Sequence, residues 1–179
     1  NALTGNAGND SLYGGAGNDS LYGGADNDLI AGGAGNDVLD GGAGVSDTLD
    51  YSASAAVTVV LNTTTGTATG GDATGDTISN FENVLGSAFA DSLTGDTNAN
   101  VLTGGAGNDS LYGGAGNDSL YGGADDDMFI GGAGNDLLDG GDGQNDTVSY
   151  ASASGAVVVN LALGTQTGSD GNDSLVGIE

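Results

Sequence analysis

The sequence predicts an all-β protein, a right-handed parallel β-roll in which short strands stack as the coils of a β-solenoid. Three observations favour this fold. A nine-residue unit, GGAGNDSLY in its clearest form, recurs along much of the chain; each unit keeps one apolar position; and 38 of the 179 residues are glycine. A unit this short cannot bury a core alone, so its strands have to stack on those of neighbouring units.

The units form two arrays that lie 99 residues apart, and each array closes with a ten-residue unit, Gly41–Asp50 and Gly140–Ser149. We therefore expect residues 1–51 and 100–150 to be two repeat arrays. Residues 52–99 would form a strand-containing spacer with degenerate units, and residues 151–179 a second, truncated spacer. One continuous elongated roll is expected, as a fragment of a larger protein.

Each unit divides into a six-residue glycine loop and a three-residue strand whose central residue is apolar. Neighbouring residues of a strand point to opposite faces, so only the central residue should point inward. These residues are Leu12, Leu21, Ile30, Leu39 and Leu49 in the first array, and Leu111, Leu120, Phe129, Leu138 and Val148 in the second. The tyrosines that follow, Tyr13, Tyr22, Tyr112 and Tyr121, should point outward.

The spacers contain β-branched runs, Val57–Leu61 and Ala156–Leu163, which predict further strands. The segment Thr63–Gly71 is rich in threonine but lacks a regular period. We therefore interpret it as an ordinary strand and turn and not as a flat surface for ice or sugar.

The charge balance excludes several classes of function. The chain has 25 acidic residues and no lysine, arginine, histidine or cysteine. Without basic residues it has no surface for nucleic acid or anionic membranes. Without histidine or cysteine it has no zinc or copper site and no thiol nucleophile. No apolar run is long enough to enter a membrane directly, and no signal peptide is visible.

Stacking two units per coil places Asp10 beside Asp28, Asp19 beside Asp37, Asp109 beside Asp127 and Asp118 beside Asp136. Two carboxylates ~5 Å apart repel by roughly 3 kcal/mol at an effective dielectric of ~20. An external cation therefore has to lie between the turns, since a generic solvated acidic face has no use for a nine-residue register. Carboxylate and carbonyl oxygens suit Ca²⁺ better than Mg²⁺, which requires a strict octahedron and keeps its waters.

The unit GGAGNDSLY resembles the RTX (repeats-in-toxin, hemolysin-type) calcium-binding nonapeptide G-G-x-G-x-D-x-U-x, in which U is apolar. The resemblance extends over more than half of the chain. It implies a β-roll with Ca²⁺ bound in the turns between stacked coils, in bacterial proteins exported by type I secretion.

The family pattern also implies ligands. One half of each site would come from a single unit, which supplies the carbonyl groups of its second and fourth loop positions and its aspartate. The next-but-one unit would supply the other half through its first and third positions and its aspartate. One site would use Gly15, Gly17 and Asp19 with Gly32, Ala34 and Asp37. Its counterpart would use Gly114, Gly116 and Asp118 with Gly131, Ala133 and Asp136.

The same pattern gives further candidate ligands. The aspartates are Asp10, Asp28, Asp47, Asp91, Asp109, Asp127 and Asp146, together with Asp26 and Asp125, which replace fourth-position glycines. The backbone candidates are Gly8, Gly23, Ala25, Gly105, Gly107, Gly122 and Ala124. Asn6 replaces a glycine, Asn100 replaces an aspartate, and the ten-residue units shift Asp47 and Asp146 by one position. Sites at these four positions are expected to be weaker, altered or missing.

Two functional hypotheses follow. The first is a non-enzymatic, calcium-dependent structural module of a secreted or cell-surface protein, which folds on binding Ca²⁺. The second is a surface-layer, adhesin or filament protein that assembles with copies of itself through the same roll. An enzyme is not expected, because no pair of acidic residues outside the repeats stands out as a candidate acid and base. Any catalytic domain would be a neighbour in the parent protein.

Overall fold

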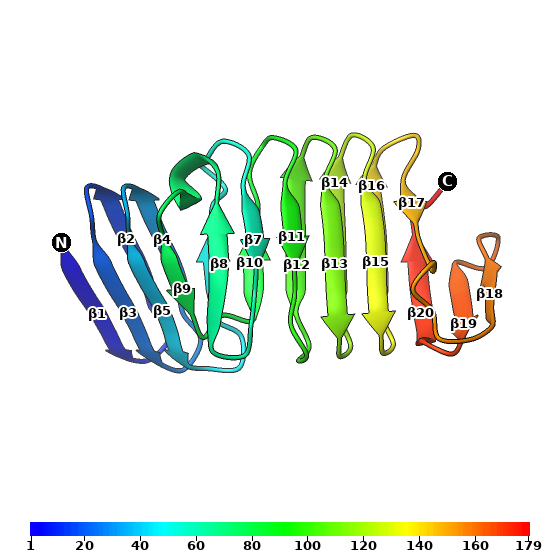
Figure 1. The fold of residues 1–179 in the computed structure, drawn as a ribbon, viewed down its shortest axis with the longest axis horizontal. Helices are drawn as coiled ribbons and strands as arrows, with labels where there is room; N and C mark the ends of the chain where they lie inside the picture. The colour runs from blue at the N-terminus through cyan, green and yellow to red at the C-terminus, as the bar shows by residue number, and fades with distance from the viewer.

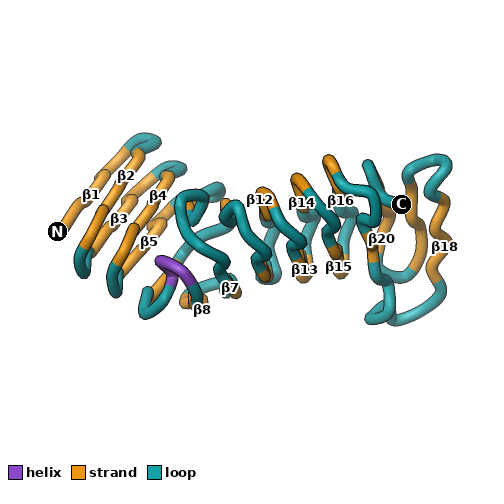
Figure 2. The backbone as a smooth tube through the Cα atoms, turned by 90° about the horizontal axis from the view of Figure 1, so that it is seen from above, coloured by secondary structure: helices purple, strands orange, loops and turns teal.

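A computed structural model describes all 179 residues, and it confirms the stacked-coil architecture. Figure 1 shows a long stack of strands with the N-terminus at one end and the C-terminus near the other. The strands form two ten-stranded sheets. We call them sheet A, in the order β1-β3-β5-β9-β8-β7-β11-β13-β15-β17, and sheet B, in the order β18-β19-β20-β16-β14-β12-β10-β6-β4-β2. The chain alternates between the two sheets and makes a turn at each edge (Figure 2).

The first array supplies six strands that alternate between the sheets. Their bounds are β1 Ala2–Ala7, β2 Ser11–Ala16, β3 Ser20–Ala25, β4 Leu29–Ala34, β5 Val38–Ala43 and β6 Thr48–Asp50. Strands β1, β2 and β3 each pair in parallel with the strand 18 residues further along, as Leu3 with Leu21 and Leu12 with Ile30, and β4 pairs with β6 at a separation of 19 residues because of the ten-residue unit. Two nine-residue units therefore make one coil, as the sequence predicts.

The spacer continues both sheets and adds antiparallel strands. It contains β7 Thr58–Val60, β8 Thr65–Thr69, a short 3₁₀ turn at Gly71–Ala73, β9 Thr77–Ser79, β10 Asn83–Leu85 and β11 Ser92–Thr94. Strand β8 runs antiparallel between β7 and β9, within sheet A. This hairpin confirms the strand expected at Val57–Leu61 and shows the Thr63–Gly71 segment as strand and turn.

The second array and the second spacer complete the stack. Their strands are β12 Val101–Ala106, β13 Ser110–Ala115, β14 Ser119–Ala124, β15 Met128–Ala133, β16 Leu137–Asp142, β17 Thr147–Val148, β18 Val157–Asn160, β19 Thr165–Gly168 and β20 Gly171–Val176. Strands β18, β19 and β20 pair antiparallel, and β20 joins β16 in parallel. This second hairpin lies in sheet B, whereas the first hairpin lies in sheet A. Corresponding strands of the two copies lie in opposite sheets, as β1 in sheet A and β12 in sheet B, so the second copy is turned by half a coil.

The core is a column of single apolar residues from each strand, packed between the two sheets. Leu21, Ile30, Leu39, Leu102 and Leu120 are completely buried, and so is Phe129. Stacked strands lie ~4.8 Å apart, so each of these side chains contacts the equivalent residue of the next coil. Tyr13, Tyr22 and Tyr112 point outward as predicted, with exposed fractions of 60%, 42% and 40%.

Two expectations about each unit need correction. The paired strands in both arrays are mostly six residues long, not three, because pairing continues into the first three loop positions, as Gly15 with Gly33 and Ala16 with Ala34. The central apolar residue is also not the only inward one. The first-position glycine, two residues later on the strand, is buried too, as at Gly23 and Gly32. The structure contains no helix with the length and hydropathy needed to cross a membrane.

Candidate metal centre

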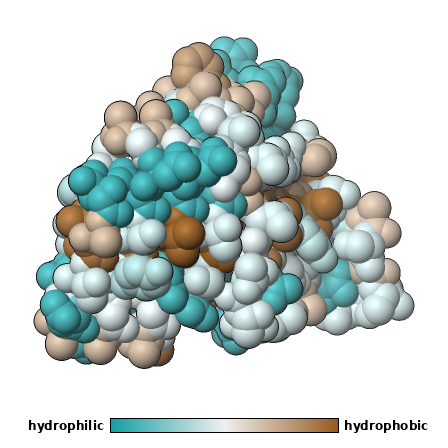
Figure 3. All heavy atoms as spheres, turned by 60° about the vertical axis from the view of Figure 1, so that its left-hand side comes forward, coloured by the Kyte–Doolittle hydropathy of each residue, from teal (hydrophilic) through white to brown (hydrophobic).

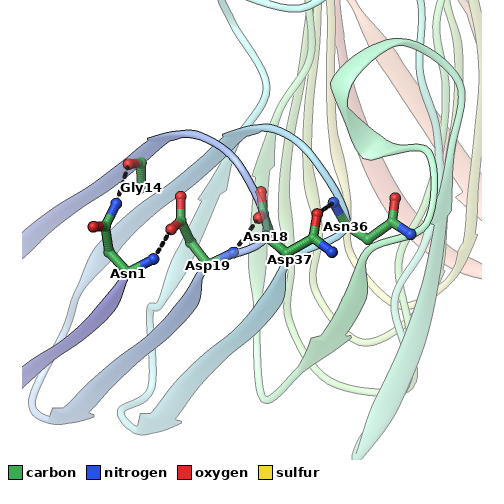
Figure 4. A network of polar contacts seen from close by, with 6 residues as sticks. All are labelled: Asn1, Gly14, Asn18, Asp19, Asn36 and Asp37. Atoms are coloured by element: carbon green, nitrogen blue, oxygen red, sulfur yellow. Dashed lines mark hydrogen bonds and ion pairs between the residues drawn. The ribbon is translucent and has the colours of Figure 1, made fainter.

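The aspartate at the sixth loop position ends each turn, and it links its coil to the next one. The backbone N–H of Asp19 donates a 2.8 Å hydrogen bond to Oδ1 of Asp37 (Figure 4). The same contact joins Asp10 to Asp28, Asp28 to Asp47, Asp91 to Asp109, Asp109 to Asp127, Asp118 to Asp136 and Asp127 to Asp146, at 2.7–2.9 Å. The predicted neighbour relations of the aspartates are therefore confirmed.

These contacts build two ladders, one on each edge of the roll. The first ladder contains Asp10, Asp28, Asp47, Glu82, Asn100, Asp118, Asp136 and Asp173. The second contains Asp19, Asp37 and Asp76, and, beyond the first hairpin, Asp91, Asp109, Asp127, Asp146 and Glu179. Asp47 and Asp146 are in register despite the longer loops that precede them. The extra residue is accommodated within the loop, where Val45 is 84% exposed.

An outer row of polar residues runs beside each ladder and joins the coils mainly through asparagine side chains, with Asp126 as an acidic member. The N–H of Asn36 donates to Oδ1 of Asn18 at 3.0 Å, and the N–H of Asn135 donates to Oδ1 of Asn117 at 2.8 Å. In these contacts the later coil is the donor, whereas in the ladders the earlier coil is the donor. Figure 3 shows hydrophilic atoms gathered in a band across the N-terminal part of the molecule.

The second carboxylate oxygen is the feature of the ladders that points to a ligand. Oδ2 is buried and has no hydrogen-bond partner in ten aspartates: Asp10, Asp19, Asp28, Asp37, Asp47, Asp109, Asp118, Asp127, Asp136 and Asp146. Buried polar atoms in proteins nearly always have a partner, and a buried charge without one is costly. No cationic side chain exists in the chain to supply that partner. The ten oxygens are therefore placed to receive an external cation.

Backbone carbonyl groups converge on the same places. A Cβ atom added to Gly5 would lie 2.5 Å from Oδ2 of Asp10 and 2.5 Å from the carbonyl oxygen of Gly23. One added to Gly14 would lie 2.8 Å from Oδ2 of Asp19 and 2.5 Å from the carbonyl oxygen of Gly32. The glycine thus leaves free a small space bordered by a carboxylate of one coil and a carbonyl of the next. This explains why the inward position beside the apolar residue is glycine.

The two ligand sets expected from the family pattern occupy matching places in the two copies. In the first set the N–H of Gly17 donates to the carbonyl of Ala34 at 2.8 Å, beside the Asp19–Asp37 contact. In the second set the N–H of Gly116 donates to the carbonyl of Ala133 at 2.9 Å. Gly15 lies opposite Gly33 and Gly114 lies opposite Gly132, so these second-position carbonyls also lie between the coils.

The remaining backbone candidates follow the same arrangement. Gly107 donates to the carbonyl of Ala124 at 3.1 Å, and the Asp26 N–H lies beside the loop of Asp47, donating to Ala43 at 3.3 Å. Gly23 and Gly122 border the spaces in front of Asp28 and Asp127, while Ala25 and Gly105 pair with equivalent residues of adjacent coils. Gly8 lies at the exposed tip, where its N–H donates to Oδ2 of Asp26 at 3.2 Å.

Asp26 and Asp125 point their carboxylates away from the ladders. Both are exposed and adopt positive φ angles of 73° and 75°, the conformation for which the family pattern has glycine. Their carbonyl oxygens, however, lie at the next loop. A Cβ on Gly44 would be 2.7 Å from the Asp26 carbonyl and 2.6 Å from Oδ2 of Asp47, and Gly143 has the same relation to Asp125 and Asp146. Asp26 and Asp125 therefore border the inter-coil space with their backbone carbonyl groups and not with their carboxylates.

At Asp91 and Asn100 the protein itself satisfies the rungs of the ladders. Asp91 accepts hydrogen bonds from Val57 and from both the N–H and the hydroxyl of Ser87, so neither of its oxygens is unpartnered. Asn100, the substituted position, accepts from Asp96 and donates through Nδ2 to the carbonyl of Glu82 at 2.8 Å. The structure therefore gives neither Asp91 nor Asn100 the unpartnered oxygen found at the ten aspartates named above.

Burial and mutual repulsion shift the titration of the ladder aspartates. Burial, with repulsion from Asp127 and Asp91, raises the pKa of Asp109 to about 7. The pKa of Asp118 and that of Asp127 are raised to about 6 by burial and by the carboxylates of Asp136 and Asp146, respectively. The same causes raise the pKa of Asp47 above its usual value. In the folded protein, burial and the neighbouring carboxylates disfavour the ionised form of each of these groups.

Side chains alone do not complete a metal site, since no group of three or more acidic, histidine or cysteine side chains gathers anywhere in the chain. Each space between coils offers two carboxylates, and backbone carbonyls have to supply the other ligands. Six to eight oxygen ligands in flexible geometry are what Ca²⁺ accepts, so the donor set fits calcium.

The sequence-based interpretation missed several members of the ladders. Asp76, Glu82, Asp173 and Glu179 lie in the two spacers, outside the arrays, yet they continue the ladders. Of these, Asp173 occupies the sixth position of the nearly complete unit Gly168–Val176. The signal that could have found them is their recurrence, because Asp76–Glu82 corresponds to Asp173–Glu179. Tyr51 and Tyr150 were also missed, and their hydroxyl groups donate to Asp76 and Asp173 at 2.9 Å.

Comparison with known proteins agrees with this geometry. The family model described as RTX calcium-binding nonapeptide repeat matches the chain in four copies, at residues 1–30, 17–47, 85–120 and 112–148. The matched segments together include more than half of the chain. Among curated proteins, none matches the chain significantly.

Proposed function

The chain belongs to the RTX calcium-binding nonapeptide repeat family, and on this premise we propose that it is a structural module whose β-roll folds when Ca²⁺ fills the ladders. The observation that carries the proposal is the set of ten buried, unpartnered aspartate oxygens in inter-coil register. Asp19, Asp37, Asp109, Asp118 and their equivalents would hold the ions, together with carbonyl groups of the glycine loops.

Without cations, the folded roll contains ten buried aspartate oxygens that have no partner. A buried carboxylate without a partner costs several kcal/mol, and a thin core of one apolar residue per strand offers little to offset ten of them. A ligand that binds only the folded state stabilises it by about 2.7 kcal/mol per site when its concentration is 100 times Kd. Several such sites in series change the balance from unfolded to folded.

Coupling of this kind supports a role in export. Extracellular calcium modules bind with Kd values of about 10⁻⁴–10⁻³ M, so they stay empty where free calcium is scarce. We propose that the parent protein leaves a bacterium by type I secretion and that this module folds at the cell surface or in the medium. Family membership and the absence of internal cations support this location.

Circular dichroism with and without calcium tests the proposal. The far-ultraviolet β signal is expected to appear in millimolar Ca²⁺ and to be lost on adding a chelator. Mg²⁺ at the same concentration serves as the control and should restore little of it. A β signal that is the same in chelator and in calcium would contradict the proposal.

Self-assembly is a second candidate, and one observation favours it. The second array stacks on the spacer through β10–β12 and β11–β13 with the same parallel register that operates within an array. The second array thus continues the roll of the first with unbroken strand pairing, although it is turned by half a coil. Light scattering during calcium addition distinguishes the two candidates, because a simple module stays monomeric and an assembling one does not.

A further inference from the structure

The first ladder continues from the repeat array into the spacer through a glutamate. The N–H of Asp47 donates to Oε2 of Glu82 at 2.9 Å, the same kind of contact that joins Asp28 to Asp47. In return, the N–H of Glu82 donates to the carbonyl of Asp47 at 3.2 Å. Glu82 therefore takes the place that the aspartate of a nonapeptide would take in the next coil, although it belongs to no nonapeptide and lies outside the segments matched by the family model.

Asp47 brings an unsatisfied charge to this contact. Its side chain is completely buried, and its Oδ2 atom has no hydrogen-bond partner. The backbone carbonyl of Asn80 approaches the same place. A Cβ on Gly41 would lie 3.0 Å from Oδ2 of Asp47 and nearer still to the Asn80 carbonyl oxygen. This is the arrangement of carboxylate, carbonyl and glycine that the nonapeptide loops show at Gly14.

The backbone of the spacer is shaped to present that carbonyl. Asn80 has a φ angle of 55°, a left-handed conformation that few residues other than glycine adopt. Its Nδ2 atom is fixed by a 2.7 Å hydrogen bond to Oδ1 of Asp40. Glu82 also lines an open cavity together with Gly44, Val45, Asn98 and Ala99, so an ion can reach its carboxylate from solvent.

The second copy repeats the whole arrangement. The N–H of Asp146 donates to Oε2 of Glu179 at 3.1 Å, and Oδ2 of the buried Asp146 is again unpartnered. The carbonyl of Gly177, with a φ angle of 61°, takes the place of the Asn80 carbonyl beside Gly140. The two spacers differ in length and in most residues, yet they keep this constellation.

At the equivalent place in the second ladder, a hydrogen-bond donor of the protein contacts the carboxylate. Where the second ladder enters the spacer, Asp76 accepts a hydrogen bond from the hydroxyl group of Tyr51. Glu82 has no such donor, and the amide of Asn100 is directed to its carbonyl and not to its carboxylate. Asp47 and Glu82 each accept one backbone N–H, but neither carboxylate receives a side-chain donor or a cationic group, and Oδ2 of Asp47 has no partner at all. Such a pair suits a hard cation.

We propose that Asp47, Glu82 and the Asn80 carbonyl form an additional Ca²⁺ site that joins the array to the spacer, with Asp146, Glu179 and the Gly177 carbonyl as its counterpart. This inference rests on the proposed function. The ion would fasten the ten-residue unit, where the nonapeptide period is interrupted, to the strand that follows. It would thereby transmit calcium-dependent order from one array into the next.

Calcium titration calorimetry on the full chain and on Glu82→Gln tests this site. Glutamine keeps an acceptor for the Asp47 N–H but removes the charge, so the variant is expected to bind one ion fewer per chain. Asp139→Asn is the matched control, because it removes one charge from the outer face of strand β16, where the Asp139 side chain makes no hydrogen bond. It should bind the full number of ions.

Each result has a distinct meaning. Equal stoichiometry and affinity in Glu82→Gln and the unmodified chain would overturn the additional site and leave the proposed function intact. An unmodified chain that binds no calcium would overturn both. Should Glu82→Gln fail to fold in calcium, a calcium-bound crystal structure of the unmodified chain decides. An ion within about 2.3–2.6 Å of Asp47 and Glu82 oxygens is expected there, and its absence from an otherwise filled ladder overturns the site.

Discussion

The hydroxyl group of Tyr51 donates a 2.9 Å hydrogen bond to Oδ2 of Asp76, and Tyr150 makes the same contact with Asp173. In both copies the aspartate continues a ladder, accepting the N–H of Asp37 or of Asp136 through its other oxygen. Burial and the adjacent carboxylate raise the pKa of Tyr51 far above its usual value, so the hydroxyl remains a donor at any physiological pH. A ladder can thus end on a protein donor instead of an ion.

Tyr51→Phe is expected to lower the free energy of unfolding in saturating calcium by about 1–3 kcal/mol, because it leaves an oxygen of the partly buried Asp76 without a donor. Denaturant unfolding followed by circular dichroism measures this change. Tyr22→Phe is the control, since the Tyr22 side chain is exposed and makes no hydrogen bond. Equal stability of the two variants would contradict the role given to Tyr51.

Acidification is expected to stabilise the calcium-free fold. The folded-state pKa of Asp109 is about 7, and that of Asp118 and Asp127 about 6, whereas an unfolded aspartate titrates near its usual value of about 3.9. A raised folded-state pKa means that the folded form binds protons more tightly. Its contribution is fully present below about pH 4 and is lost as the pH rises through about 6 to 7.

Thermal unfolding in calcium-free buffer at about pH 5 and about pH 7.5 measures this effect, and the higher Tm should occur at the lower pH. In saturating calcium the order should reverse, because protons compete with the ions for the same oxygens. A calcium-free Tm that rises with pH would contradict the assignment of these raised pKa values.

Asn100→Asp is expected to make the fold more dependent on calcium. The change removes the Nδ2 donor to the carbonyl of Glu82 and places a carboxylate between Glu82 and Asp118. Without calcium the variant should be less stable by about 1–3 kcal/mol, and added calcium should restore the loss. Tm measured against calcium concentration reports the change.

The control is Asn117→Asp, which adds the same charge at an exposed loop position and keeps the acceptor for the Asn135 N–H. Its calcium dependence should stay close to that of the unmodified chain. If Asn100→Asp and Asn117→Asp respond equally to calcium, the Asn100 amide is not a substitute for an ion.

Two glycines of one loop should respond differently to alanine. At Gly14 the added Cβ would enter the space between Oδ2 of Asp19 and the carbonyl of Gly32, so Gly14→Ala should bind one ion fewer. At Gly17 the Cβ would meet nothing within 4 Å, and the φ angle of 108° is the only penalty. Gly17→Ala should therefore lose about 1–2 kcal/mol of stability and no ion.

Calcium stoichiometry, measured on both variants, reports whether the added Cβ blocks an ion site. Denaturant unfolding of the same variants reports the cost of backbone strain. Loss of an ion in Gly17→Ala, or full stoichiometry in Gly14→Ala, would contradict this account of the glycine positions.

The nine-residue period was sufficient to predict the coils, the inward leucines and the register of the aspartates. Leu21 and Leu120 occupy the core, and Asp19 lies beside Asp37, because a strict period leaves the chain only one way to stack. The same period could not show that Gly14 also points inward. That follows from the space that the Asp19 carboxylate requires, which is visible only in three dimensions.

The spacers were harder to predict for a related reason. Glu82 joins the first ladder 35 residues after Asp47, and Asp76 joins the second 39 residues after Asp37. The length of the β7–β8 hairpin sets these separations, and nothing in a local pattern specifies that length. Only the recurrence of both residues in the second copy carries information about them.

The half-coil offset between the copies has a consequence for longer chains of this type. Because successive 99-residue copies are turned by half a coil, they are related by a two-fold screw operation along the roll axis, and the structural repeat contains two copies. The hairpin strands then lie alternately in the two sheets, β8 in sheet A and β19 in sheet B. In such a longer chain both faces of the roll would carry hairpins. A partner that recognises a hairpin would therefore find one on either face.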